Sequence, residues 1–302
     1  MQQAPGIYVE ILIRSNIGEI WRHTQDPQLH ELWDLRFTKI QYLPRASEAE
    51  PQRFIYTTRI GFGLQISGEG ESTGNREEST GRRTSALKFW STDPKSLIEE
   101  GSGYWRYIPM QNGVRFLTWY DYQTRFGATG RFVDRILFRP LIGWATAWSF
   151  DRLRLWIDEG PDPRASLRLS AVHACARVAI AFIWMWEGLV PKLLYNHADE
   201  RSMMAASHLS SGLIPFIGVA EIAIAAWAIL SWRSRWFFAF NIIAMVVALA
   251  NVAIVSPSYL VAAFNPVTLN LAMIALSVIG CVAGAKIPSA SRCLRRPPKE
   301  SL

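Results

Sequence analysis

The chain has 302 residues, a net charge of +7 and 19% charged side chains, and its mean hydropathy of +0.08 averages a polar half and an apolar half. The length predicts two domains, because one domain usually holds about 100–200 residues. The cysteines have no C-x-x-C spacing, so a disulfide framework and a zinc site are excluded, and we predict no metal. We expect them to pack as small apolar residues: Cys175, Cys281 and Cys293.

The first 157 residues predict a strand, two short helices, a run of strands and a long helix. Residues 8–15 read as a strand, residues 16–25 have apolar side chains at helical spacing, and Asp26-Pro27 ends that helix. Residues 130–157 predict the long helix, interrupted at Pro140. This order predicts an α+β fold in which an antiparallel sheet curves around a helix and leaves a cavity. The predicted strands are residues 39–44, 52–60, 64–72, 84–91, 104–110 and 114–126.

Aromatic side chains from these strands are the candidates for lining the cavity. Alternation places every second residue of a strand on one face, so a subset of them faces inward. The candidates are Phe54, Tyr56, Phe62, Phe89, Trp90, Trp105, Phe116 and Trp119.

No catalytic residue is assigned in this half of the chain. His23 and His30 lie seven residues apart across a Pro-broken helix, without triad or metal spacing, so we expect surface or capping roles for them. The glycines at residues 61–63 and 68–70 are expected in tight turns, because a phosphate cradle would need a strand running into a helix.

An amphipathic pattern occupies residues 140–158. Most of its apolar arc is expected to pack into the sheet of its own domain. Tryptophan and arginine also settle at bilayer interfaces, so a second interpretation stays open. The side chains in question are Trp144, Trp148 and Trp156, with Arg131, Arg135 and Arg139 upstream.

Four apolar stretches are each long enough to cross a hydrocarbon core of about 30 Å as helices. They are residues 172–194, 209–230, 236–255 and 264–285. Lys and Arg gather before the first, between the second and third, and after the fourth. The positive-inside rule therefore predicts cytoplasmic termini, and no signal peptide is expected at residues 1–5. The predicted organisation is a soluble domain at residues 1–160, a linker at 161–170, a four-helix transmembrane bundle at 171–287 and a basic cytoplasmic tail at 288–302.

Ionisable and amide side chains inside the spans are costly and need partners, so they form the predicted polar site of the membrane half. Two interpretations are open: interhelical hydrogen bonding that fixes the bundle, or a pocket for a quinone-like head group or a proton-transfer step. Gly188 and Pro191 loosen the end of the helix after Glu187 and favour a niche beside Lys192. The predicted site is Glu187, Lys192, Glu221, Arg177 and Asn241.

Two family resemblances follow from short motifs. Residues from about 7 to 157 resemble the START-like, polyketide-cyclase-like (SRPBCC) helix-grip domains, through V-E-I-L-I-R-S at 9–15, I-G-E-I-W at 17–21 and D-P-Q-L-H-E-L-W-D at 26–34. Residues from about 170 to 285 resemble the DoxX-like membrane family, through Arg177 and W-M-W-E-G-L-V-P-K-L-L at 184–194. The first resemblance implies a pocket for an apolar or amphipathic small molecule. The second implies a membrane bundle. Some members of that family resemble subunits of quinone-linked oxidoreductases.

The sequence thus predicts a multi-pass protein of the bacterial inner membrane that binds or handles an apolar small molecule or lipid at the cytoplasmic surface. We expect this role to be non-catalytic. Two alternatives remain: a subunit of a quinone-linked membrane oxidoreductase, and a structural membrane scaffold. No cofactor is firmly predicted, although a quinone fits the second class. Expected partners are membrane lipids, the apolar ligand, and a membrane protein or a second copy, but no nucleic acid, because no basic stripe with interleaved aromatics appears.

Overall fold

The computed structural model describes residues 6–47 and 50–298. It contains two compact units, residues 1–166 with residues 288–302, and residues 167–287. The predicted fold class is confirmed in both units. The first has an antiparallel sheet with a long helix, and the second has four helices that are long and apolar enough to cross a membrane.

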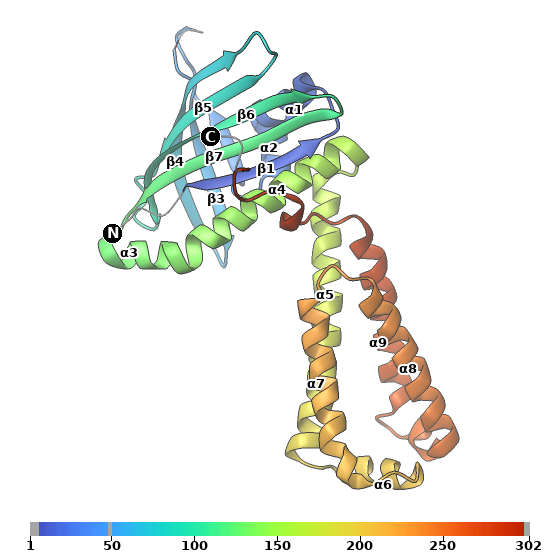
Figure 1. Ribbon diagram of the computed structural model, residues 1–302. Helices are drawn as coiled ribbons and strands as arrows, with labels where there is room; N and C mark the ends of the chain where they lie inside the picture. The colour runs from blue at the N-terminus through green and yellow to red at the C-terminus, as the bar shows by residue number, and fades with distance from the viewer. Residues whose placement is uncertain (1–5, 48–49, 299–302) are drawn as a thin grey trace. The chain divides into compact units, whose positions relative to one another are not determined.

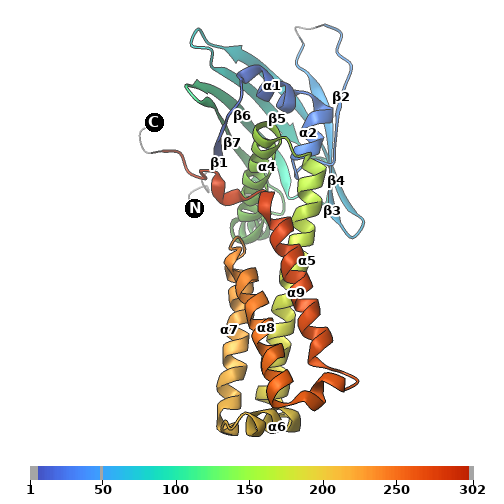
Figure 2. The same cartoon turned by 90° about the vertical axis from the view of Figure 1, so that its right-hand side faces the viewer.

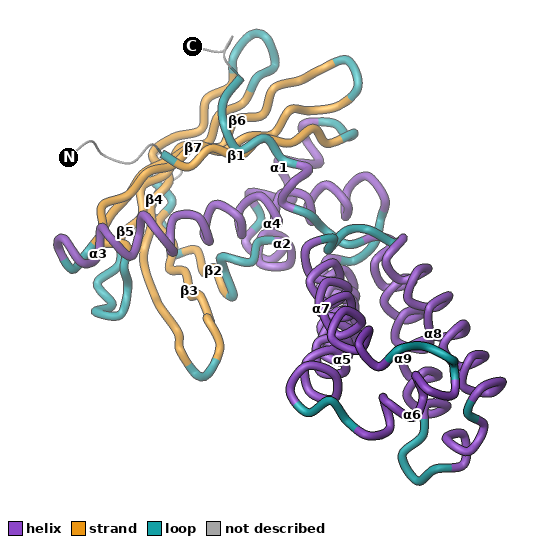
Figure 3. The backbone as a smooth tube through the Cα atoms, turned by 60° about the horizontal axis from the view of Figure 1, so that its bottom comes forward, coloured by secondary structure: helices purple, strands orange, loops and turns teal. Residues whose placement is uncertain are grey.

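The first unit is built on one antiparallel sheet with the strand order β1-β7-β6-β5-β4-β3-β2 (Figure 1). Strands β2 to β7 follow one another as neighbours, and β1 pairs with β7 at one edge. The sheet curves, so that its inner face is concave (Figure 3). The strands are β1 (Ile7–Ile13), β2 (Lys39–Tyr42), β3 (Arg53–Gly61), β4 (Leu64–Glu77), β5 (Arg83–Trp90), β6 (Ile98–Met110) and β7 (Gly113–Thr124).

Two groups of helices lie on the concave side of the sheet. The long helix α4 runs beside β1, and the short helices α1 and α2 lie near the C-terminal end of α4 (Figures 1 and 2). Asp26 separates α1 from α2, because its extended backbone ends the first helix and its carboxylate accepts from the backbone of Gln28 at 2.8 Å. The helices are α1 (Ile17–Gln25), α2 (Pro27–Trp33), α3 (Gly127–Val133), the π-helical turn η1 (Asp134–Phe138) and α4 (Arg139–Glu159).

The core of this unit is strongly aromatic. Phe150 of α4 stacks on Phe116 of β7 with ring centroids 4.5 Å apart, and Trp33 of α2 meets Phe150 edge-on at 6.1 Å. The predicted position of the amphipathic tryptophans is borne out in part, since Trp148 is buried in this core while Trp144 is exposed. Large rings supply much buried area per residue, so side chains fill the space between α2, α4 and β7.

The segment after the last membrane helix returns to the first unit. Leu294 exchanges two backbone hydrogen bonds of 2.9 Å with Glu10 of the edge strand β1, and Cys293 is buried with its Sγ 3.1 Å from the Ala147 carbonyl oxygen. Asp151 of α4 accepts from the backbone of Ser289. Described residues 288–298 of the predicted basic cytoplasmic tail are therefore a folded part of this unit, and Leu294 pairs with the edge strand β1 at Glu10.

The second unit is a bundle of four long helices that run side by side (Figure 2). Its core includes Ile180, Phe237, Met245 and Met273. The segments are α5 (Pro163–Glu187), the π-helical η2 (Gly188–Leu194), α6 (Ala198–Ala206), η3 (Ser211–Leu213), α7 (Ile214–Leu230), α8 (Trp236–Val255), η4 (Pro257–Val261), α9 (Pro266–Ala283) and η5 (Gly284–Lys286).

Helix α5 begins at Pro163, inside the segment for which the sequence suggested a linker. Proline suits the first turn of a helix, because the N–H that it lacks has no helical partner there. Arg152 of α4 holds this start by donating to the Pro163 carbonyl oxygen at 2.6 and 2.9 Å. Burial lowers the pKa of Arg152 to about 10. The connection between α4 and α5 is thus only residues 160–162.

Candidate functional site

A row of residues with alternating aromatic rings and glycines crosses five strands on the concave face. The strand register pairs Phe54 with Gly70, Gly70 with Phe89, Phe89 with Gly101, and Gly101 with Tyr122. Directly opposite residues in an antiparallel sheet point to the same face, so all five share the concave side. We call this set the ring row.

The glycines of the ring row leave space for the rings. A Cβ atom at Gly70 would lie 2.4 Å from the Phe54 ring, and one at Gly101 would lie 2.5 Å from the Phe89 ring. Tyr56 lies over Gly68 in the same way, at 2.3 Å. The sequence suggested that Gly68 and Gly70 form a turn, and this is wrong: both lie inside β4, whereas the turn is at residues 61–63. Close packing of rings on bare backbone makes a smooth apolar wall.

The eight cavity candidates divide between four places. Trp105 and Phe116 are buried in the core, while Phe54, Tyr56 and Phe89 are half-buried on the concave wall. Successive residues of a strand point to opposite faces, so Trp90, which follows the inward Phe89, and Trp119, which precedes the inward Tyr120, lie on the convex face. Trp119 stacks there on Tyr104. Phe62 is fully exposed at the tip of the β3–β4 turn. Sequence reasoning missed several inward aromatic residues, among them Phe37, Tyr107, Tyr120 and Tyr122.

A polar cluster lies beside this wall. The buried Asp34 carboxylate is 3.0 Å from His30 Nε2 and 2.6 Å from Arg36 Nη2. Burial acts to raise the pKa of Asp34, but the Arg36 charge and the hydrogen bonds from His30 and Arg36 together hold that pKa below its ordinary value. The guanidinium of Arg36 also lies over the Tyr120 ring, 5.6 Å from its centroid. The Asp34 carboxylate thus has both of its charged neighbours within hydrogen-bond distance.

The sequence predicts surface or capping roles for the two histidines, but both side chains are buried. His30 is buried between Trp33 and Trp105, with ring centroids 4.9 and 5.0 Å away. His23 is buried too, with Nδ1 2.8 Å from the Glu19 carbonyl oxygen. The described residues contain no group of three or more His, Cys, Asp or Glu side chains placed to hold a metal ion. Both histidines therefore have packing and hydrogen-bonding roles in the core.

In the membrane unit the predicted polar residues lie in three separate places, and the first of these centres on Lys192. Its ammonium group is 3.0 Å from Glu200 and 3.1 Å from Glu221. Gly188 and Gly218 let the two helices approach closely here, since a Cβ on either would lie within 2.7 Å of the other's carbonyl oxygen. One cation is thus shared by two carboxylates.

Glu187 lies next to this group but is not part of it. Among the described residues its carboxylate has no hydrogen bond or ion pair, and it faces a hollow of about 360 Å³. The hollow is lined by Trp186, Glu187, Val190, Pro191, Tyr195 and His197. Pro191 lines this hollow, whereas Gly188 and Lys192, beside which the sequence predicts a niche, are not among its lining residues.

Arg177 and Asn241 occupy the other two places. Arg177 is fully buried and donates to the carbonyl oxygens of Ala228 at 2.7 Å, Ser231 at 3.0 Å and Ser234, at the end of α7. Asn241 accepts from Trp184 Nε1 at 2.7 Å and donates to Ser277 Oγ at 2.8 Å. Both sets of contacts connect helices, as the hydrogen-bonding interpretation predicts.

Comparisons with known proteins agree with this architecture. Residues 181–278 match the model of the DoxX-like family. The uncharacterized membrane protein YndG of Bacillus subtilis (strain 168) is 47% identical over 189 residues, which cover 62% of this chain and 70% of that protein. The chain belongs to the family of this membrane protein. Its C-terminal part is a DoxX-like domain.

Solved structures resemble the first unit more weakly. The di-domain ARO/CYC protein StfQ of the steffimycin biosynthetic pathway is 14% identical, with a TM-score of 0.40, and the match covers 51% of this chain and 50% of that one. The STAR-related lipid transfer protein of Xanthomonas axonopodis is 13% identical, with a TM-score of 0.37 and coverages of 52% and 96%. Likeness at this level carries no conclusion about function.

Proposed function

We propose that the protein binds an apolar or amphipathic small molecule, such as a lipid, on the concave face of its first unit at the membrane surface, without catalysing a reaction. The ring row is the observation that carries this proposal. Half-buried rings on a concave wall leave apolar surface that a ligand can cover, and such surface is favourable to remove from water. The Asp34–Arg36 cluster offers a polar group at the side of the same wall.

Neighbouring aromatic residues of β5 give a matched test. Phe89 is on the concave face and Trp90 on the convex face, and both are half-buried. The full chain is delipidated in detergent, given palmitic acid and examined by native mass spectrometry. Phe89→Asp should weaken binding by about tenfold or more, which corresponds to roughly 1.4 kcal/mol, whereas Trp90→Asp should not. Equal binding by both variants would refute the concave site.

We further propose that the bundle is in the bacterial inner membrane, with both termini in the cytoplasm. The Lys and Arg bias of the connecting segments supports this orientation. Cysteines introduced at His197 and Ser258, in a chain whose natural cysteines are replaced by serine, should react with an impermeant maleimide in intact cells. A cysteine at Ser291 should not react. Labelling at Ser291 alone would reverse the orientation.

A second candidate function is supported by the hollow beside Glu187. An unpaired carboxylate next to Trp186 and Tyr195 suits a polar aromatic head group such as that of a quinone, which would make the bundle a subunit of a membrane oxidoreductase. Solvent extraction of the purified protein tests this candidate. A quinone that co-purifies with the wild type and is lost from Glu187→Leu supports it, and equal amounts in both reject it.

A further inference from the structure

The segment from the end of β7 into α4 exposes a continuous apolar stripe. Phe132, Ile136 and Leu137 are 65%, 61% and 62% exposed. Their spacing places them on one side of the helical run, while Asp134, Phe138 and Ile142 on the other side pack toward the sheet. The exposed members are Phe126, Phe132, Val133, Ile136, Leu137, Leu141 and Trp144, and we call them the apolar stripe.

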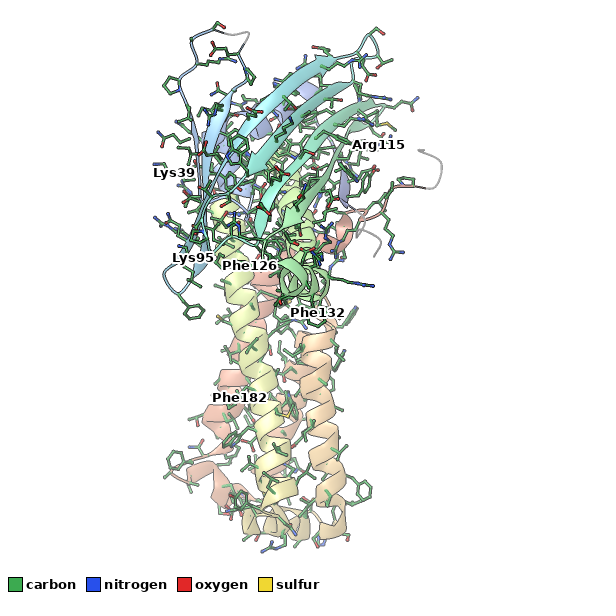
Figure 4. All side chains as sticks on the ribbon, turned by 90° about the vertical axis from the view of Figure 1, so that its left-hand side faces the viewer. Lys39, Lys95, Arg115, Phe126, Phe132 and Phe182 are labelled. Carbon is green, nitrogen blue, oxygen red and sulfur yellow. The ribbon has the colours of Figure 1, made fainter. Side chains whose placement is uncertain are left out.

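A second apolar projection lies at the same end of the sheet. Strands β3, β5 and β7 run in one direction, so the β3–β4 turn and the start of α3 share an end, and the β6–β7 turn is at the other. The β3–β4 turn exposes Ile60, Phe62 and Leu64. In Figure 4 Phe126, Phe132 and Lys95 lie at this end, and Arg115 lies toward the opposite one. Two separate elements therefore present bare apolar side chains in one region.

The exposed charges within the stripe itself are positive, while Glu99 and Glu100, exposed at the same end of the sheet, belong to β6. Arg131 and Arg135 are exposed within the stripe. Asp134, the acidic residue of this stretch, is buried, accepts from Tyr122 at 2.6 Å and is paired with Arg139 at 2.9 Å. Exposed apolar side chains flanked by arginines are typical of a surface that enters the headgroup region of an anionic bilayer.

The chain itself keeps the stripe near a membrane. Helix α4 is followed after residues 160–162 by α5, which is long and apolar enough to span a bilayer. Three residues extend over about 10 Å at most, so the domain is tethered at a high effective concentration beside the lipid surface. Weak apolar and electrostatic contacts are sufficient for docking under this constraint.

We infer that the apolar stripe and the β3–β4 turn dock the first unit onto the anionic leaflet on its own side of the membrane. This docking site is distinct from the concave face and does not depend on a ligand there. The occupant is the lipid surface because the exposed charge within the stripe is cationic and the tether is short. If a second copy of the chain or another protein covered the stripe instead, photocrosslinking would attach that protein in place of lipid.

Photocrosslinking in the full chain tests the docking. The photoreactive residue p-benzoylphenylalanine replaces Ile136, Phe62 or Met110, the last being a 49% exposed residue at the opposite end of the sheet. Each variant is placed in nanodiscs of phosphatidylcholine with or without phosphatidylglycerol and irradiated. Lipid adducts should form at positions 136 and 62 but not at 110, and should increase with phosphatidylglycerol.

Charge variants sharpen the test. Arg131→Gln with Arg135→Gln should reduce lipid adducts at position 136 by about tenfold on anionic discs, as expected for two basic residues near such a surface. The matched control, Arg22→Gln with Arg76→Gln, removes the same charge from exposed positions elsewhere and should change nothing. Adduct yields at 136 and 62 that equal those at 110, or crosslinks to a second copy or another protein in place of lipid, would overturn the inference.

Discussion

Arg36 in the first unit and Arg177 in the membrane unit are both largely buried guanidinium groups, but different partners satisfy them. Arg36 donates to the Asp34 carboxylate at 2.6 and 2.9 Å. Arg177 donates instead to backbone carbonyl oxygens at the end of α7, and Phe238 covers its charge with the ring centroid 4.7 Å away. The last carbonyls of a helix have no helical partners and carry partial negative charge, so a cation stabilises them without a carboxylate.

The comparison shows two ways to satisfy a buried guanidinium group. Arg36 is neutralised by a counter-charge and its hydrogen bonds. In a bilayer, unsatisfied backbone is itself expensive, so one arginine that satisfies three carbonyls replaces water at a helix end. Two arginines whose burial would cost similar desolvation energy thus stabilise different groups: Arg36 pairs with a carboxylate, and Arg177 satisfies backbone carbonyl oxygens.

Replacing Arg177 should have the largest effect on stability. Arg177→Gln removes the guanidinium donors of Ala228, Ser231 and Ser234, of which only the Ser231 carbonyl oxygen has a further backbone donor, the Ser234 N–H, among the contacts of the described residues. In an apolar environment this loss should cost about 3 kcal/mol or more. Thermal unfolding in detergent measures this loss. Arg168→Gln removes the same charge from an exposed position of α5 and should leave the transition unchanged. Equal transitions for the two variants would show that Arg177 does not cap α7.

Asp34→Asn should destabilise the first unit in a pH-dependent way. The folded pKa of Asp34 lies below its ordinary value, so its stabilisation is complete above the unfolded carboxyl pKa of about 3.9 and is lost as the pH falls below that value. Hydrogen exchange in α2 and β2 should therefore be faster in Asp34→Asn than in the wild type at pH 6, and the difference should shrink below pH 4. Glu99→Gln, at an exposed strand position, is the control, and a difference that grows on acidification would contradict the assignment.

Glu187 and Lys192 should differ sharply although they are five residues apart. Lys192→Met leaves Glu200 and Glu221 without their shared cation and should loosen the bundle, by about 2–3 kcal/mol. Glu187→Leu removes no ion pair and should change stability by about 0.5 kcal/mol or less. Thermal unfolding of the two variants gives the comparison. Equal destabilisation would place Glu187 in the bundle's hydrogen-bond network after all.

Local patterns were sufficient for much of the fold. The four spans and the meander could be predicted because long apolar runs, alternation and turn residues are all properties of neighbouring residues. The pair Gly68 and Gly70 was misassigned because glycine is equally suited to a turn and to a strand on which a ring lies, and only the strand register distinguishes them. The start of α5 at Pro163 was missed because proline interrupts a pattern that the helix tolerates in its first turn.

The candidate sites depended more on contacts between distant residues. His30 looked like a surface residue because its burial depends on Trp105, which lies in a distant strand. Leu294 pairs with Glu10 of β1 although almost the whole length of the chain separates the two residues, and no local pattern indicates that pairing. Glu187 and Lys192 were identified because charged side chains are costly to bury in a bilayer. That Glu187 faces an open hollow while Lys192 joins an ion cluster is visible only from the packing of the helices.

A photolabel map of the full chain tests the proposed ligand site most directly. The protein in nanodiscs is irradiated with a fatty acid that carries a diazirine in its alkyl chain, and the labelled peptides are identified by mass spectrometry. We predict labels on the half-buried concave positions of β3 and β5, including Phe54, Tyr56 and Phe89, that excess unlabelled fatty acid removes. Labels confined to the membrane helices, or spread equally over Phe89 and its convex neighbour Trp90, would contradict a ligand site on the ring row.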